Sequence, residues 1–123
     1  YTSDIYQIAE MIAAQGDITV VHVKDYIKHP KPNGYKSYHM VVTVPVYLTD
    51  GPVETKVEIQ IRSVAMDFWA SLEHKIAYKF EGNAPEGLRH ELKDCADVVD
   101  MLDKKMFSLN EAITAYAKEQ QKL

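Results

Sequence analysis

The segment 24–39 holds the densest group of chemically capable side chains in the sequence. It contains four lysines, two histidines and three tyrosines around the turn dipeptide Asn33-Gly34, in a chain whose formal net charge is -4. Lysine ammonium groups neutralise phosphates, and Tyr35, beside a glycine, can lay its ring against a base. A local cationic group on an acidic chain indicates one anionic ligand of limited size. An ordinary solvated hairpin loop remains the alternative, because Asn-Gly and Lys-Pro are common turn dipeptides.

A second polar set follows in the strand-like run 57–62. Its apolar residues alternate with Glu58, Gln60 and Arg62, which places those three side chains on one face of a strand. The run after the lysine-rich loop alternates as well, with Tyr35, Ser37 and His39 on one side and Tyr38, Met40, Val42 and Val44 on the other. If the two strands pair, a carboxylate, an amide, a guanidinium, an imidazole and a phenol share one sheet face. A half-solvated antiparallel sheet explains the alternation but not this choice of residues, so we favour a site.

Three motifs carry a family resemblance. They are Lys-Asp-Tyr-Ile-x-x-x-Lys-Pro-Asn-Gly-Tyr-Lys-Ser-Tyr-His at 24–39, Val-Glu-Ile-Gln-Ile-Arg at 57–62 and Ala-Met-Asp-Phe-Trp-Ala-Ser-Leu-Glu-His at 65–74. From about Ile18 to the C-terminus the chain resembles the synthetase domain of RelA/SpoT-type (p)ppGpp synthetases, and most closely the small, single-domain alarmone synthetases. The resemblance implies a GTP pyrophosphokinase of the stringent response, which transfers pyrophosphate from ATP to the 3′-hydroxyl of GDP or GTP. It also implies an α+β, nucleotidyltransferase-like fold, with a mixed or antiparallel sheet, flanking helices and a long C-terminal helix.

The resemblance assigns the acceptor nucleotide to the lysine-rich loop. Tyr35 falls where the family stacks the guanine, and Asn33 belongs to the same nucleotide-binding turn. Lys24, Lys31 and His39 fall at positions that approach nucleotide phosphates.

The resemblance assigns the chemistry to Glu58. This residue matches the carboxylate associated with Mg²⁺ and with activation of the attacking 3′-hydroxyl. Such a role is chemically sound, because a carboxylate can take the hydroxyl proton and is a hard oxygen ligand. Gln60 can hydrogen-bond the ribose or hold Glu58, and Asp67 can accept hydrogen bonds from the guanine edge. Ser71 and His74 follow Asp67 at helical spacing and border the expected site.

The front of the family's catalytic domain has no counterpart in the sequence. In the family a basic helix that grips ATP and an Asp-containing strand for the metal come first, whereas residues 1–15 contain no lysine or arginine. We therefore expect residues 1–80 to be the acceptor-nucleotide half of a synthetase domain whose N-terminal part is absent. Alone, this half should be catalytically silent, because phosphoryl transfer depends on positioning and charge neutralisation.

Composition is typical of one globular domain. With 123 residues, 46% hydrophobic and 26% charged, the chain is neither disordered nor membranous, and no apolar run approaches about 20 residues. The start lacks a signal-peptide pattern, so we expect a cytoplasmic protein. Cys95 is the lone cysteine and is predicted to be a reduced core thiol. The histidines lack metal-ligand spacing, and no structural zinc is expected.

Periodicity predicts helices at 3–14 and 64–80 and strands at 18–27, 38–48 and 53–62. Pro45 predicts an edge position or a bulge in the middle strand. One stripe of the second helix is predicted to pack on the sheet, and it consists of Ala65, Phe68, Trp69, Leu72 and Ile76.

The segment 81–123 is predicted to be a long helix that mediates oligomerisation. Its apolar residues are spaced alternately by four and three, as in a coiled coil, and this seam comprises Leu88, Leu92, Cys95, Val99, Leu102, Met106, Leu109, Ile113 and Tyr116. Packing of the seam on its own domain is the alternative. Small synthetases of this kind form homotetramers, so the resemblance favours self-association.

Two other functions stay open. One is a noncatalytic guanine-nucleotide-binding regulatory module with a helical interaction tail. The other is weak binding of single-stranded RNA through the lysines and tyrosines of 24–39, although the net charge of -4 argues against a large nucleic-acid footprint.

Overall fold

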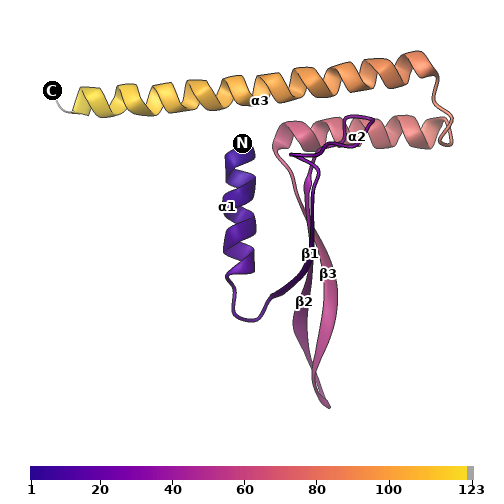
Figure 1. Ribbon diagram of the computed structural model, residues 1–123, viewed down its shortest axis with the longest axis vertical. Helices are drawn as coiled ribbons and strands as arrows, with labels where there is room; N and C mark the ends of the chain where they lie inside the picture. The colour runs from indigo at the N-terminus through magenta and orange to yellow at the C-terminus, as the bar shows by residue number, and fades with distance from the viewer. Residues whose placement is uncertain (122–123) are drawn as a thin grey trace.

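Three antiparallel strands form the centre of the fold, and helices lie beside and above them (Figure 1). The computed structural model describes residues 1–121, so Lys122 and Leu123 of the predicted tail lie outside the described residues. The elements, in chain order, are α1 (Thr2–Ala13), β1 (Thr19–Asp25), β2 (Tyr38–Leu48), β3 (Gly51–Ile61), α2 (Val64–Lys79) and α3 (Glu86–Gln121). The predicted α+β fold, with its antiparallel sheet and long C-terminal helix, is confirmed.

The sheet has the order β1-β2-β3, so β2 is the central strand. The prediction of an edge position or a bulge at Pro45 is confirmed as a local edge position, although β2 as a whole is central, and the irregularity of the sheet lies in β1 between Val20 and His22. Pro45 is tolerated because β1 pairs with β2 only as far as Thr43. At Pro45 the strand has β3 alone beside it, through Glu54, and no ladder bond to β1 is lost.

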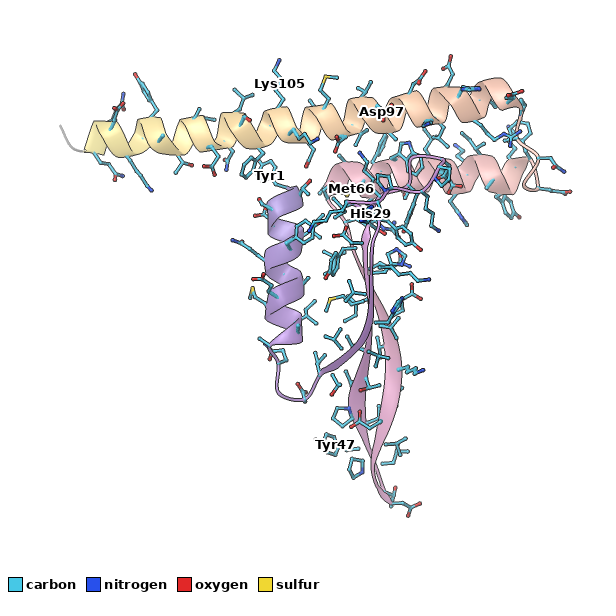
Figure 2. The ribbon with its side chains drawn as sticks, viewed as in Figure 1. Tyr1, His29, Tyr47, Met66, Asp97 and Lys105 are labelled. Atoms are coloured by element: carbon cyan, nitrogen blue, oxygen red, sulfur yellow. The ribbon has the colours of Figure 1, made fainter. Side chains whose placement is uncertain are left out.

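One face of the sheet is covered by α1. Ile5 and Ala9 of this helix are buried against Met40, Val42 and Ile61 of the sheet. Beyond the end of α1 the β2–β3 hairpin continues uncovered, as Figure 1 shows. Tyr47, near the tip of that hairpin in Figure 2, is 78% exposed. The buried core thus lies against the half of the sheet next to α2, which is also the half that contains the polar residues of 57–62.

A hydrogen bond fixes the start of the lysine-rich loop to α1. The Tyr6 hydroxyl donates to Asp25 Oδ2 at 2.7 Å, while Asp25 Oδ1 accepts the backbone N–H groups of Ile27 and Lys28. Burial alone would raise the pKa of Asp25, but the hydrogen bonds from Lys28, Tyr6 and Ile27 outweigh it and lower that pKa. Burial and the bond to Asp25 raise the pKa of Tyr6 to about 12.

The apolar stripe predicted for α2 is largely wrong. Phe68 and Leu72 are 76% and 40% exposed, whereas Met66 joins the sheet core (labelled in Figure 2) and Trp69 is buried against α3. The Trp69 indole N–H donates to the carbonyl oxygen of Leu92 at 2.8 Å. Only part of α2 lies over the sheet in Figure 1, and the Trp69 side chain packs on α3 instead.

Helix α3 is about 54 Å long at 1.5 Å per residue and lies along α2 and then over the first turn of α1 (Figure 1). Its contacts with α1 include a hydrogen bond from Thr2 to Asp103 of 3.0 Å and an edge-on packing of the rings of Tyr1 and Phe107, with centroids 5.7 Å apart. Among residues 1–121, no helix combines the length and apolar character needed to cross a bilayer.

Most of the predicted seam of α3 does not pack on the domain. Leu92 is buried, but Cys95 is exposed, so the prediction of a core thiol is wrong. Val99 is half-buried, and the large seam residues beyond it are between 49% and 66% exposed, namely Leu102, Met106, Leu109, Ile113 and Tyr116. The stripe that contacts the domain is displaced by one residue, because Ala96, Asp100 and Asp103 face inward.

Candidate functional site

The face of the sheet opposite α1 carries the predicted polar set. His39 in β2 pairs directly with Gln60 in β3 and with Lys24 in β1, so these three residues form one row across the sheet. Glu58 lies two residues before Gln60 on the same face and is diagonal to His39. The predicted convergence of these side chains is confirmed, because β2 and β3 pair in the register that the alternation requires.

A chain of hydrogen bonds leads from the loop to Glu58. The Ser37 hydroxyl donates to the Tyr35 hydroxyl at 3.0 Å, and the Tyr35 hydroxyl lies 3.1 Å from His39 Nε2. His39 Nδ1 lies 3.2 Å from Glu58 Oε1. Sequence reasoning placed Ser37 beside Tyr35 and His39 but gave it no role. The available signal was a small hydroxyl residue between two ring residues on the same side of the chain.

Burial favours the neutral form of the imidazole at the centre of this chain. Burial lowers the pKa of His39 below its ordinary value, more than the neighbouring Glu58 raises it. Its side chain is 14% exposed, against 55% for Glu58. A neutral ring has one donor and one acceptor nitrogen. Since a carboxylate only accepts, we assign the proton to Nδ1, which donates to Glu58, and Nε2 then accepts from Tyr35.

A second set of hydrogen bonds reaches Glu58 from the other end of β3. Gln60 Nε2 donates to Glu58 Oε1 at 3.3 Å, and the Arg62 guanidinium donates to Gln60 Oε1. Arg62 also donates to Asp67 Oδ1 at 3.1 Å, in the first turn of α2. Arg62 was expected on this face without an assigned function, and it joins Asp67 to the other polar residues. An open depression of about 430 Å³ lies at this end, lined by Gln60, Arg62, Ser63, Val64 and Asp67.

The ring of Tyr35 is surrounded by cations and aromatic rings. Lys31 Nζ lies 5.1 Å from its centroid and the Arg62 guanidinium carbon 5.7 Å. The rings of Tyr26 and His39 meet it edge to face, with centroids 6.1 Å and 5.9 Å away. Positive charge beside an aromatic ring suits a ligand that combines a planar base with phosphate groups.

Helix α3 contacts the loop that carries Tyr35. Asn33 Oδ1 accepts the backbone N–H of Tyr35 at 3.0 Å and shapes the turn. Gly34 lies against Ala96 of α3, and Lys36 Nζ forms a 3.1 Å ion pair with Asp100. The hydrogen bonds from Lys104 and Lys36 outweigh the burial of Asp100 and lower the pKa of its carboxyl.

Four predicted residues lie outside the hydrogen-bonded set. Lys31 places its ammonium group over the rings of Tyr26 and Tyr35 but makes no side-chain hydrogen bond within residues 1–121. Lys24 shares the row of His39, but its exposed side chain makes no hydrogen bond or ion pair within residues 1–121. The Ser71 hydroxyl donates to the Asp67 carbonyl of its own helix at 3.0 Å. His74 is exposed one turn further along α2, away from the network. Ser71 and His74 therefore share one face of α2, but within residues 1–121 neither joins the hydrogen bonds to the Glu58 carboxylate.

A resident metal site is not formed by protein ligands alone. Within the described residues 1–121, no group of three or more His, Cys, Asp or Glu side chains could hold a metal ion. Glu58 can supply one carboxylate oxygen, and Mg²⁺ commonly takes its other ligands from substrate phosphates and water. The residues present therefore fit a metal that arrives with a nucleotide.

Comparison with known proteins identifies the family. The family described as "Region found in RelA / SpoT proteins" matches residues 1–83. The chain is 47% identical to the GTP pyrophosphokinase YwaC of Bacillus subtilis over 113 residues, which cover 92% of this chain and 54% of that protein. It is 42% identical to the GTP pyrophosphokinase YjbM of Bacillus subtilis over 106 residues, covering 86% of this chain and 50% of that protein. The chain thus spans about half the length of these relatives.

Solved structures agree with this result. Small alarmone synthetase 2 from Bacillus subtilis superposes with a TM-score of 0.88 at 47% identity, over 91% of this chain and 61% of that one. Small alarmone synthetase 1 from Bacillus subtilis, bound to its product pppGpp, gives 0.87 at 40% identity, over 92% and 58%. The family match covers more than half of this chain and the fold is that of small alarmone synthetases, so this chain belongs to the RelA/SpoT family.

Proposed function

We propose that the protein containing this chain is a GTP pyrophosphokinase that makes (p)ppGpp. The observation that carries the proposal is the position of Glu58, whose carboxylate stands on the solvent-facing side of the sheet and is joined through His39 to the ring of Tyr35. Relatives that share up to 47% of its residues are named GTP pyrophosphokinases. The proposal gives the loop to the acceptor nucleotide and the carboxylate to its ribose.

The reaction balances with one carboxylate as the base. The 3′-oxygen of GDP or GTP attacks the β-phosphorus of ATP, the new O–P bond forms, and the bond from the β-phosphorus to the α–β bridging oxygen breaks. AMP leaves, the acceptor gains the β- and γ-phosphoryl groups, and the hydroxyl proton passes to Glu58. Lys24, Lys31 and His39 are proposed to face the nucleotide phosphates, while Asn33, Gln60 and Asp67 orient the acceptor.

Mg²⁺ is the proposed cofactor. When bound with the nucleotide, it would neutralise phosphate charge, and Glu58 is the residue that would contribute an oxygen ligand to it. The side chain is 55% exposed, so a hydrated metal has access to it.

We further propose that residues 1–80 form the acceptor-nucleotide half of the catalytic domain. Every polar residue of the network lies on β2, β3, the loop before β2, the connection from β3 to α2 or the start of α2. The donor nucleotide and its cations would then be held by residues outside this sequence. We propose that the protein acts in the cytoplasm, where both nucleotides are present. The relatives, which are about twice as long, supply room for such a half.

Replacing Glu58 with Gln tests the catalytic assignment. We expect Glu58→Gln in the complete natural protein to abolish formation of AMP and ppGpp from ATP and GDP, while GDP affinity stays within about twofold, because the amide keeps the shape but not the basicity. Glu54→Gln is the matched control, since Glu54 is an exposed carboxylate on the same strand and face. Equal loss of binding and turnover would instead favour the noncatalytic nucleotide-binding module.

Tyr35→Ala tests the assignment of the base. Loss of stacking should weaken GDP binding by about 1–3 kcal/mol, measured by calorimetry. Unchanged affinity would remove the loop from the acceptor site. The same titration with a single-stranded RNA oligonucleotide examines the RNA alternative, for which we expect only weak and salt-sensitive binding.

The exposed seam of α3 supports a proposal of self-association, with a homotetramer as the expected state. Leu102, Met106, Leu109 and Ile113 are 49–66% exposed on one long helix, although its other stripe already packs on the domain. Packing of the seam on its own domain is thereby disfavoured. Light scattering of the wild type and of Leu109→Lys measures this, and an unchanged monomer for both would refute it.

A further inference from the structure

We propose that Ser37 and His39 are positioning residues: Ser37 holds the hydroxyl of Tyr35, and His39 joins that hydroxyl to the carboxylate of Glu58. Seating of the acceptor base and orientation of the carboxylate therefore depend on each other. The inference rests on the proposed function above. It adds to that function a mechanical link between recognition and chemistry, made by two residues that do not themselves react.

Every link in the chain has a defined donor. Glu58 Oε1 can only accept, so His39 Nδ1 donates across the 3.2 Å contact. The Tyr35 hydroxyl accepts from Ser37, so its own proton is free to be donated to His39 Nε2, 3.1 Å away. The phenol oxygen in turn accepts from the Ser37 hydroxyl at 3.0 Å. All three donors point the same way, from the core toward the carboxylate.

The chain is anchored at its buried end. Ser37 has 0% relative exposure, whereas the carboxylate at the other end is 55% exposed. Within residues 1–121, Tyr35 is the hydrogen-bond partner of the Ser37 hydroxyl. Rotation of the Tyr35 ring would strand a fully buried hydroxyl, which proteins rarely tolerate. Ser37 therefore holds the phenol in the one orientation that also reaches His39.

The carboxylate is oriented through a single oxygen. His39 Nδ1 and Gln60 Nε2 both meet Glu58 Oε1, at 3.2 Å and 3.3 Å. Among the described residues no donor occupies Oε2, which leaves that oxygen for the acceptor hydroxyl. A base that displaces the Tyr35 ring would pull on the imidazole and, through it, on Oε1. A correctly stacked base leaves the carboxylate in place.

The phenol hydroxyl can be removed without removing the stacking ring, and this separates positioning from binding. In the complete natural protein we expect Tyr35→Phe and Ser37→Ala each to lower kcat about three- to tenfold, the range for one lost hydrogen bond. The KM for GDP should stay within about twofold, because the ring is retained. The double variant should be no slower than the slower single variant, because both changes break the same chain of hydrogen bonds. Tyr47→Phe, at the exposed hairpin tip, is the matched control.

The roles of the two ring nitrogens of His39 can be tested separately. The side-chain nitrogen of Asn lies near the place of Nδ1 and that of Gln near Nε2, so His39→Asn should keep the contact with Glu58 and retain more kcat than His39→Gln. Equal kcat for these two variants would overturn the link from His39 to Glu58.

The outcomes distinguish this inference from the proposed function. No AMP from ATP and GDP with the wild type overturns both. An active wild type with Tyr35→Phe and Ser37→Ala within twofold of its kcat overturns the positioning chain alone, as does a rise in KM at constant kcat or an additive double variant. If Ser37→Ala or Tyr35→Phe unfolds, as judged by circular dichroism, the comparison of His39→Asn with His39→Gln decides between these outcomes, because both variants leave the bond between Ser37 and Tyr35 in place.

Discussion

Gly34, in the loop that carries Tyr35, lies in close contact with Ala96 of α3 and makes a sharp test of that packing. Its φ of +98° favours glycine, and a Cβ atom at this position would lie 2.8 Å from the Cβ of Ala96 and 3.6 Å from Trp69 Cζ2. Real Cβ atoms essentially never approach another atom to less than 3.0 Å. We predict that Gly34→Ala destabilises the protein by moving the loop away from α3.

The magnitude has two parts. An L-residue in left-handed backbone costs about 1–2 kcal/mol, and forcing an extra methyl group into a packed contact costs about 1–3 kcal/mol. The reduced freedom of the unfolded chain returns about 0.4–1 kcal/mol. The free energy of unfolding should therefore fall by about 2–4 kcal/mol. Urea unfolding of the complete natural protein, followed by circular dichroism, measures this value.

Two other glycines separate the two parts. Gly82 has a φ of +82° but nothing within 4 Å of its Cβ position, so Gly82→Ala should cost only the backbone part less the same return from the unfolded chain, about 0–1.6 kcal/mol. Gly16 has neither constraint, and Gly16→Ala should be neutral or slightly stabilising. Adding Ala96→Gly to Gly34→Ala should recover the steric part, relative to Ala96→Gly alone. If Gly34→Ala costs no more than Gly82→Ala, the close contact between loop and α3 is refuted.

Further predictions concern the contacts that frame the site. Trp69→Phe should lower the free energy of unfolding by about 1–3 kcal/mol, because the buried bond to the Leu92 carbonyl is lost, and wild-type stability in urea would contradict this. Ser63→Ala removes the side-chain cap of α2 and should cost about 1 kcal/mol in the same assay. Asp25 has a lowered pKa when folded, so its contribution is present above its unfolded pKa of 3.8 and is lost as pH falls through the folded value. Tyr6 has a raised pKa, so its contribution is present below pH 10 and is lost as pH rises through about 12. Tyr6→Phe should flatten both limbs of the urea midpoint plotted against pH, and an unchanged profile would refute the coupling.

The polar face of the sheet could be predicted from the sequence because a strand has only two faces. Once Val57, Ile59 and Ile61 are assigned to the core, the intervening Glu58 and Gln60 must face outward together. Pairing with β2 then brings His39 beside them without further information. The links through Ser37 could not be predicted in this way, since a hydroxyl has no periodicity and its partner depends on a rotamer.

The packing of α3 could not be predicted because several of its contacts with the domain are polar. Asp100 pairs with Lys36 and Asp103 accepts from Thr2, so the inward stripe carries carboxylates that a hydrophobic pattern assigns to solvent. The 3–4 repeat located a genuine apolar seam, but one residue out of phase with the docked stripe. Cys95 was misassigned for that reason, because it belongs to the seam and not to the face that meets α2.

The loop that carries Tyr35 ties the position of α3 to the geometry of the site. Tyr35 turns toward His39 on the sheet, while its neighbours Gly34 and Lys36 meet α3 at Ala96 and Asp100. Successive residues of one short segment cannot shift independently, because each peptide unit is rigid and leaves two torsions per residue. A displacement of α3 that breaks both contacts must therefore loosen the ring of Tyr35, even though the helix lies on the other side of the loop from the carboxylate. It follows that variants of the docked stripe should alter turnover as well as stability, whereas variants of the exposed seam should leave the loop in place.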